Sequence, residues 1–150
     1  MDGGVGNDVL VSTAASGGDT LNGGSGNDRL TGGAGADTFR WTLADEGTAA
    51  APARDTITDF NTAAYAAGGD RLDLSNLLSG TATTASVVDG YLDFSRSGSA
   101  DTLIRVHPAG ATGPVTQEIL LQGVDLTSNG TLNDQAIIQN LLTNGKLLTD

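Results

Sequence analysis

Aspartates recur near the start of the chain at a spacing that could hold metal ions. Four nonapeptides carry Asp at their sixth position: GGVGNDVLV at 3–11, AASGGDTLN at 14–22, GGSGNDRLT at 23–31 and GGAGADTFR at 32–40. Their fourth residue is Gly and their eighth is large and apolar. A carboxylate beside glycine-rich backbone gathers hard oxygen ligands, which suit Ca²⁺. The pattern is that of the calcium-binding nonapeptide of parallel β-rolls.

Backbone carbonyls of the turns are expected to complete the ligand set. Each nonapeptide forms half a coil, so the turns on one side come from alternate repeats. We therefore expect Asp8 and Asp28 to share one calcium ion, and Asp19 and Asp37 to share another on the opposite side. The second repeat has two alanines in place of the paired glycines, which weakens the second site. The predicted ligands in the repeats are Gly3, Val5, Asp8, Ser16, Asp19, Gly23, Ser25, Asn27, Asp28, Gly32, Ala34 and Asp37.

More aspartates cluster after the repeats, at positions 55, 59, 70 and 73. They could be ordinary turn aspartates that bond to nearby backbone N–H groups. We favour one further calcium site that caps the roll, with Asp59, Asp70 and Asp73 as its ligands.

Glycines and apolar residues must position these ligands. Glycine allows positive φ and close backbone packing in the turn, and the apolar eighth residue points inward from a short strand. A flexible Gly/Asp-rich linker would have no reason to repeat that apolar residue. Without calcium the stacked carboxylates repel each other, so we expect residues 1–40 to fold only when calcium binds.

The remainder of the chain is predicted to be mostly β. SVVDGYLDFS predicts a hairpin around Asp89-Gly90, and DTLIRV and TQEILLQGV predict two further strands. Near the C-terminus the apolar period becomes helical, in AIIQNLL, with Asn133 or Asp134 at the start and Asn144-Gly145 at the end.

The expected fold class is all-β: a short calcium-bound parallel β-roll, capped by a small antiparallel β-sandwich, with a short C-terminal helix. The expected domains are the repeats at 1–40, a sandwich-like cap at 41–130, and a helix with a secretion signal at 131–150. The repeat pattern is already present at the first residues, so we expect the array to continue upstream in a longer protein.

Composition excludes several functions. The net charge is −11 and Lys146 is the only lysine, so nucleic acid is not an expected partner. With no cysteine, disulfides and thiolate metal sites are impossible. No apolar run is long enough to span a membrane, so we expect no membrane insertion. We expect a monomer.

Enzyme signatures are missing. His107 is the only histidine, no G-x-S-x-G surrounds a serine, and no phosphate-binding G-x-x-x-x-G-K-[ST] is present. We therefore expect no catalytic residues and no cofactor other than Ca²⁺.

The nonapeptides resemble those of RTX (repeats-in-toxin) proteins. DTITDF, GDRLDLSNLL, EILLQGVDL and IIQNLLTNGKLL resemble the C-terminal domain of type I-secreted RTX proteins, especially large bacterial adhesins. The resemblance implies export by type I machinery that recognises the C-terminus. It also implies calcium-driven folding outside the cell, and an extracellular or cell-surface location. Two alternatives stay open: the C-terminal tail of a secreted RTX enzyme such as a protease or lipase, or a carbohydrate-binding module.

Overall fold

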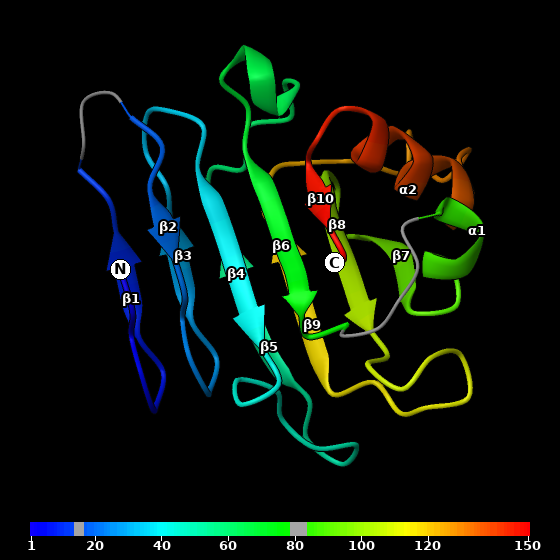
Figure 1. Cartoon of the computed structure of the whole chain (residues 1–150), viewed down its shortest axis with the longest axis horizontal. Helices are drawn as coiled ribbons and strands as arrows, with labels where there is room; N and C mark the ends of the chain where they lie inside the picture. The colour runs from blue at the N-terminus through cyan, green and yellow to red at the C-terminus, as the bar shows by residue number, and fades with distance from the viewer. Residues whose placement is uncertain (14–16, 79–83) are drawn as a thin grey trace.

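The computed structural model describes residues 1–13, 17–78 and 84–150, which form two β-sheets wound from one chain (Figure 1). The elements are β1 (Val9–Val11), β2 (Thr20–Leu21), β3 (Arg29–Thr31), β4 (Thr38–Thr42), β5 (Ala53–Ile57), η1 (Tyr65–Ala67), β6 (Arg71–Asn76), α1 (Ala85–Val88), β7 (Leu92–Ser97), β8 (Asp101–Val106), β9 (Gln117–Leu121), α2 (Asp134–Thr143) and β10 (Leu147–Leu148).

The chain passes back and forth between the two sheets. The six-stranded sheet has the order β1-β3-β5-β9-β8-β7, and the four-stranded sheet has the order β10-β6-β4-β2. Successive coils are β1 with β2, β3 with β4, β5 with β6, and β9 with β10; we call them coils one to four. Neighbouring coils pair in parallel, whereas β7 and β8 join β9 in antiparallel pairs. The predicted all-β class and parallel roll are confirmed.

The core is a pair of side-chain columns between the sheets. In one column Leu30 lies beside Leu10 and Ile57, and the register continues to Leu121. In the other, the order is Leu21, Phe39, Leu72 and Leu147. These residues are at most 6% exposed. The apolar eighth residue of each nonapeptide therefore builds the core as expected, since alternate strand residues face the same side.

The predicted hairpin around Asp89-Gly90 is wrong. Residues 85–88 form helix α1, whose Ala85 and Val88 are buried three residues apart on one face. Asp89 ends that helix, and the antiparallel turn lies later, at Gly98, between β7 and β8. Local Asp-Gly chemistry fits both a hairpin and a helix end, and burial of the apolar pair decides between them.

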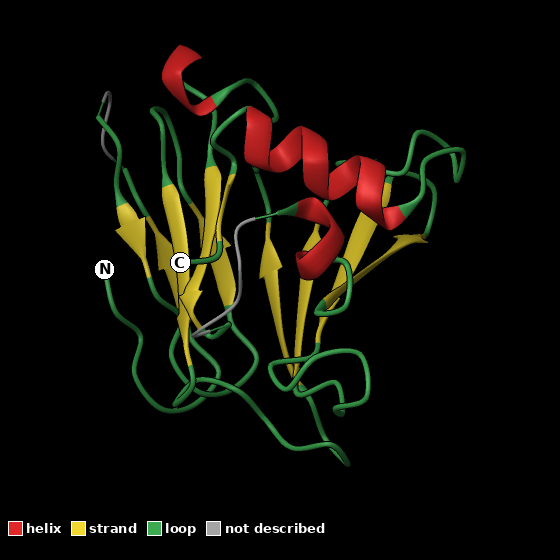
Figure 2. Cartoon of the chain, turned by 45° about the vertical axis from the view of Figure 1, so that its right-hand side comes forward, coloured by secondary structure: helices red, strands yellow, loops and turns green. Residues whose placement is uncertain are grey.

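The predicted C-terminal helix is confirmed as α2. Asn133 caps its start by accepting a hydrogen bond from the Ala136 N–H. Ile137, Ile138 and Leu141 are buried, and α2 packs against α1, β7 and β10 at the end of the roll far from the N-terminus (Figure 2). Within the three described segments, no helix is long and apolar enough to cross a membrane.

Both sheets cross the expected boundaries at 40/41 and 130/131. β3 pairs with β5 across the first, and β6 pairs with β10 across the second. Whether the three segments fold separately stays a prediction.

Candidate metal centre

Two ladders of aspartates run along the roll, one on each side. Ladder A contains Asp8, Asp28 and Asp55. The backbone N–H of Asp8 donates to Asp28 Oδ1 at 2.8 Å, and the backbone N–H of Asp28 donates to Asp55 Oδ1 at 2.8 Å. Each carboxylate therefore fixes the turn of the coil before it.

Ladder B repeats the arrangement with Asp19, Asp37 and Asp70. The backbone N–H of Asp19 donates to Asp37 Oδ1 at 2.7 Å, and that of Asp37 donates to Asp70 Oδ1 at 2.9 Å. The structure thus brings together both pairs, Asp8 with Asp28 and Asp19 with Asp37, that the sequence predicts to share a metal ion.

The second oxygen of several ladder residues is buried without a hydrogen-bond donor. Within the described residues, the Oδ2 atoms of Asp8, Asp28 and Asp37 have no partner and almost no solvent exposure. A carboxylate oxygen removed from water needs a donor or a cation to offset its desolvation. Three such oxygens in the glycine-rich turns point to ligands that the protein itself does not provide.

Glycine at the first repeat position leaves room beside each of these oxygens. A Cβ added to Gly23 would lie 2.2 Å from Asp28 Oδ2, and one added to Gly32 would lie 2.5 Å from Asp37 Oδ2. A Cβ on Gly3 would lie 2.9 Å from Asp8 Oδ2 and 2.4 Å from the Gly23 carbonyl oxygen. Carboxylate and carbonyl oxygens thus face one small space, and an all-oxygen set of this kind fits Ca²⁺.

Burial and like charge both oppose ionisation in these turns. Burial raises the pKa of Asp28, and the nearby carboxylates of Asp8 and Asp45 add to the rise. Burial likewise raises the pKa of Asp37, helped by Asp19 and Asp59. A bound cation would reverse this cost by stabilising the charged carboxylates.

The turn residues predicted from the repeats lie beside the ladders. Val5 is opposite Ser25 in a parallel bridge, and the Ser25 carbonyl accepts the Gly6 N–H at 2.8 Å. Asn27 belongs to a separate ladder: its N–H donates to Asn7 Oδ1, and its own Oδ1 accepts the Arg54 N–H. Ala34 is exposed in its turn, and Ser16 lies outside the described residues.

The predicted capping residues are not all together. Asp59 accepts the N–H groups of Gly32 and Gly33, so it holds the fourth repeat's turn. Asp70 ends ladder B, and its Oδ2 accepts the Asn61 N–H at 2.8 Å. Asp73 lies further along β6, where it bonds to Ser75. A calcium site formed by all three aspartates stays a prediction.

Asp55 is the ladder residue that was not among the predicted ligands. A signal for it exists, because AAPARDTIT at 50–58 and YAAGGDRLD at 65–73 keep Asp sixth and an apolar residue eighth. Both have lost several turn glycines, so they do not read as repeats. They form coil three, whose strands are β5 and β6.

Comparison with known proteins identifies the family. The model of the peptidase M10 serralysin C-terminal domain matches residues 2–107. The chain belongs to this serralysin C-terminal family. The family is the C-terminal, non-catalytic RTX-repeat region of serralysin peptidases, and serralysin-type C-terminal domains belong to secreted proteins. The chain has no significant match among curated proteins.

Two solved structures are similar to this member of the serralysin C-terminal family. The AlgE6R2 subunit of the Azotobacter vinelandii mannuronan C5-epimerase is 32% identical, with a TM-score of 0.61, over 99% of this chain and 80% of that one. The AlgE6R3 subunit of the same enzyme is 30% identical, with a TM-score of 0.53, over 79% of this chain and 71% of that one.

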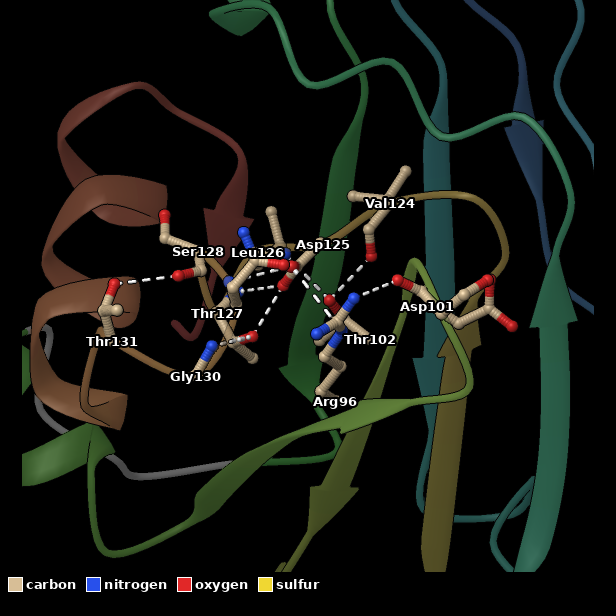
Figure 3. Close-up of polar contacts among 12 residues, drawn as sticks. Arg96, Asp101, Thr102, Val124, Asp125, Leu126, Thr127, Ser128, Gly130 and Thr131 are labelled. Carbon is tan, nitrogen blue, oxygen red and sulfur yellow. Dashed lines mark hydrogen bonds and ion pairs between the residues drawn. The ribbon is translucent and has the colours of Figure 1, made fainter.

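A separate acidic turn precedes α2 in this serralysin C-terminal domain. Asp125 accepts hydrogen bonds from the Thr127 N–H and hydroxyl and from the Asn129 N–H, and Arg96 lies 3.9 Å away (Figure 3). The Thr127 hydroxyl is the first of several donors that lower the pKa of Asp125. Because both of its oxygens already have donors, this turn lacks the unpartnered oxygens found in the ladders.

Acidic side chains alone would not make a site. In the part of the chain that the structure describes, no three His, Asp or Glu side chains converge as a metal-binding group. The ladders instead offer one or two carboxylates per turn, so most ligands would be backbone carbonyls. That balance is compatible with Ca²⁺, which accepts six to eight oxygens in flexible geometry.

Proposed function

We propose that the chain is a calcium-binding RTX module whose first two coils fold around calcium ions held between stacked turns. The unpartnered Oδ2 atoms of Asp8, Asp28 and Asp37 support the proposal most directly. Asp8 and Asp28 would hold one ion with the Gly3 and Gly23 turns, and Asp19 and Asp37 another with the Gly32 turn. Bound calcium supplies positive charge that offsets carboxylate repulsion.

Calcium titration by calorimetry tests this proposal with a matched pair of variants. Asp28→Ala removes a buried carboxylate of ladder A, so we expect at least a tenfold loss of calcium affinity. Asp89→Ala removes an exposed carboxylate that follows α1 and should leave binding unchanged. Equal affinities for the two variants, or no calcium binding by the wild-type chain, would refute the assignment.

We further propose that the module belongs to the C-terminal part of a large secreted protein. The sequence resemblance favours an adhesin. The family of peptidase C-terminal domains and the similarity to epimerase subunits favour the alternative, the tail of a secreted enzyme. Sequencing upstream of residue 1 decides between them: tandem immunoglobulin-like repeats would support the adhesin, and a catalytic domain would support the enzyme tail.

A polysaccharide-binding role is a second candidate. The two similar structures are subunits of an epimerase named for mannuronan. In this acidic chain, Arg54 and Arg105 flank Glu118 on neighbouring strands of the six-stranded sheet, at 3.9 and 3.3 Å. Titration with oligomannuronate should perturb the NMR signals of β5 and β8, and Arg54→Ala should weaken that effect. An unchanged spectrum would exclude this role.

Export through the C-terminus is proposed from the resemblance. The last twenty residues also contribute Ile138 and Leu147 to the core, so deleting them would damage the fold as well as any signal. Substituting exposed residues of α2, such as Gln139 and Asn140, separates the two effects. We expect reduced export by a type I system with unchanged thermal stability. Normal export of such variants would argue against a signal in α2.

A further inference from the structure

The two aspartate ladders change character at coil three. In coils one and two, the ladder residues Asp8, Asp28 and Asp37 each keep a buried Oδ2 without a donor, whereas Asp19 Oδ2 accepts the Ser12 hydroxyl at 2.5 Å. In coil three, Asp55 and Asp70 make the same backbone bond through Oδ1, but their Oδ2 atoms bond to donors of the protein. The same residue type at the same repeat position therefore has two different chemical environments.

Asp55 is held by side chains from two other strands. Its Oδ2 accepts the indole Nε1–H of Trp41 at 2.7 Å and an amide N–H of Gln117 at 2.9 Å. Trp41 belongs to β4 of coil two and Gln117 to β9 of coil four. Asp55, Trp41 and Gln117 are at most 1% exposed. One carboxylate thus ties three successive coils together with donors that need no metal ion.

On ladder B, the second carboxylate oxygen of Asp70 also accepts a hydrogen bond from the protein. Its Oδ2 accepts the backbone N–H of Asn61 at 2.8 Å, and the residue is 2% exposed. Beyond it, Gly145 takes the corresponding place ahead of β10, so ladder B has no further carboxylate. The buried ammonium of Lys146 donates to the Thr62 carbonyl at 3.0 Å, so this end carries its own positive charge.

We propose that Asp55 and Asp70 close the two ladders without metal, so that residues 41–150 form a calcium-independent block, on which coil one and the part of coil two before Trp41 assemble when calcium binds. This inference rests on the proposed calcium-binding function and limits it to the first two coils. Asp55 and Asp70 then act as positioning residues, because they fix the turns of Asp28 and Asp37 through backbone N–H groups. The proposed metal ions would lie in coils one and two only, whereas the ladders continue into coil three.

Trp41 provides a direct probe, because it is the only tryptophan and donates to Asp55. Its fluorescence is to be recorded for the wild-type chain in millimolar calcium and in excess EGTA, alongside circular dichroism. We expect the emission maximum to stay at the short wavelength of a buried indole in both conditions, while EGTA reduces the β signal. A reversible red shift of Trp41 in EGTA would overturn the inference.

Asp28→Asn and Asp55→Asn form a matched pair, since both residues accept a ladder N–H through one oxygen. We expect Asp28→Asn to remove more than half of the calcium-induced rise in Tm and to change Tm in EGTA little. Asp55→Asn places an amide N–H₂ opposite donating Trp41 and Gln117, so we expect Tm to fall by about 5–10 °C in both conditions. The calcium-induced rise should persist.

The outcomes separate this inference from the function on which it rests. If Asp55→Asn reduces the calcium-induced rise as much as Asp28→Asn does, Asp55 is a metal ligand and the inference is wrong. If the wild-type Tm does not respond to calcium at all, the proposed function itself is wrong. Should Asp55→Asn fail to fold, the wild-type Trp41 emission still decides whether the block survives chelation.

Discussion

Coils one and two share the backbone arrangement of coils three and four but differ in their turn residues, strand lengths and hydrogen-bond donors. Both regions pair in parallel and stack an apolar residue from every strand in the core. The first region has glycine-rich turns, short strands and buried oxygens without donors. The second has longer strands in β5, β6 and β9, few turn glycines, and an Asp55 carboxylate that accepts hydrogen bonds from Gln117 and from Trp41 at the end of coil two.

On the proposed function, this contrast means that one fold is stabilised in two ways. A turn built almost entirely of glycine and aspartate has few side-chain contacts, and we propose that bound ions supply its stability. A turn that has lost those glycines regains side chains that donate hydrogen bonds and bury apolar surface. The transition occurs within coil two, where β4 extends to Thr42 and contributes the buried Trp41.

Calcium removal should produce the largest difference between the two regions, measured as the rate of amide hydrogen exchange. We expect amide hydrogen exchange in EGTA to become fast throughout β1, β2 and β3, because the proposed ions hold the turns beside those strands. Strands β6, β8 and β9 should keep their protection. Mass spectrometry of peptic peptides measures both at once. Uniform loss of protection along the chain would remove the distinction between the two regions.

Alanine substitutions in the core should lower stability in a calcium-dependent way in the first region and independently of calcium in the second. Leu21 and Ile119 are both fully buried, in β2 and β9 respectively. Leucine- or isoleucine-to-alanine changes at such sites cost about 2–5 kcal/mol. We expect Ile119→Ala to destabilise the chain with and without calcium, and Leu21→Ala to do so only with calcium. Denaturant unfolding in both conditions measures the effect, and equal losses in EGTA would contradict the comparison.

A glycine substitution should weaken the calcium site without touching the core. Gly23→Ala places a methyl group 2.2 Å from Asp28 Oδ2, so the turn or the carboxylate must move. We expect about a tenfold loss of calcium affinity, which corresponds to about 1.4 kcal/mol. Gly90→Ala is the control, because its nearest neighbour would be 3.6 Å away. Calorimetric titration compares the two, and similar affinities would show that this space is not used by an ion.

Acidification should change Tm less, and in opposite directions in EGTA and in calcium. Burial raises the folded-state pKa of Asp55 and of Asp70 to about 6 from the usual value of 3.8. Because the pKa is higher in the folded state, protonation of these carboxyl groups stabilises the fold. Their contribution to the free energy of unfolding is full below pH 3.8 and is lost as the pH rises through about 6.

In EGTA we therefore expect Tm to increase by a few degrees when the pH is lowered from 7 to 5. Burial opposes the charged form of His107, but its bonds to Gly113 and Asp93 outweigh this and raise its pKa, which acts in the same direction. In calcium, protonation competes with the metal ion, so Tm should fall instead. Thermal scans at both pH values provide the measurement. A chelated chain that loses stability at pH 5 would contradict the assigned burial of Asp55 and Asp70.

The sequence predicts the first two coils well because each residue there has a local reason for its identity. Asp28, for example, is identified by glycines and a leucine within one nonapeptide, and its partner Asp8 follows from the repeat period. The C-terminal helix was also predictable, since Asn133 and the apolar period are both local signals.

The remaining features depend on contacts that no local pattern encodes. Gln117 donates to Asp55 across 62 positions of sequence, and nothing near either residue indicates the other. Coil three keeps the aspartate and the apolar residue of a repeat but has lost most of the turn glycines, so its membership of the roll is visible only in the strand register. The error at Asp89-Gly90 arose because the same dipeptide ends a helix and turns a hairpin equally well.

The bonds within each aspartate ladder all have the same direction: a carboxylate reaches back to the N–H of the coil before it. Each of these turns is therefore held by a carboxylate of the coil that follows it in the sequence. If the C-terminus emerged first, the carboxylate that accepts the N–H of each new turn would already be in place. If the N-terminus emerged first, each turn would lack this acceptor until the next coil had formed.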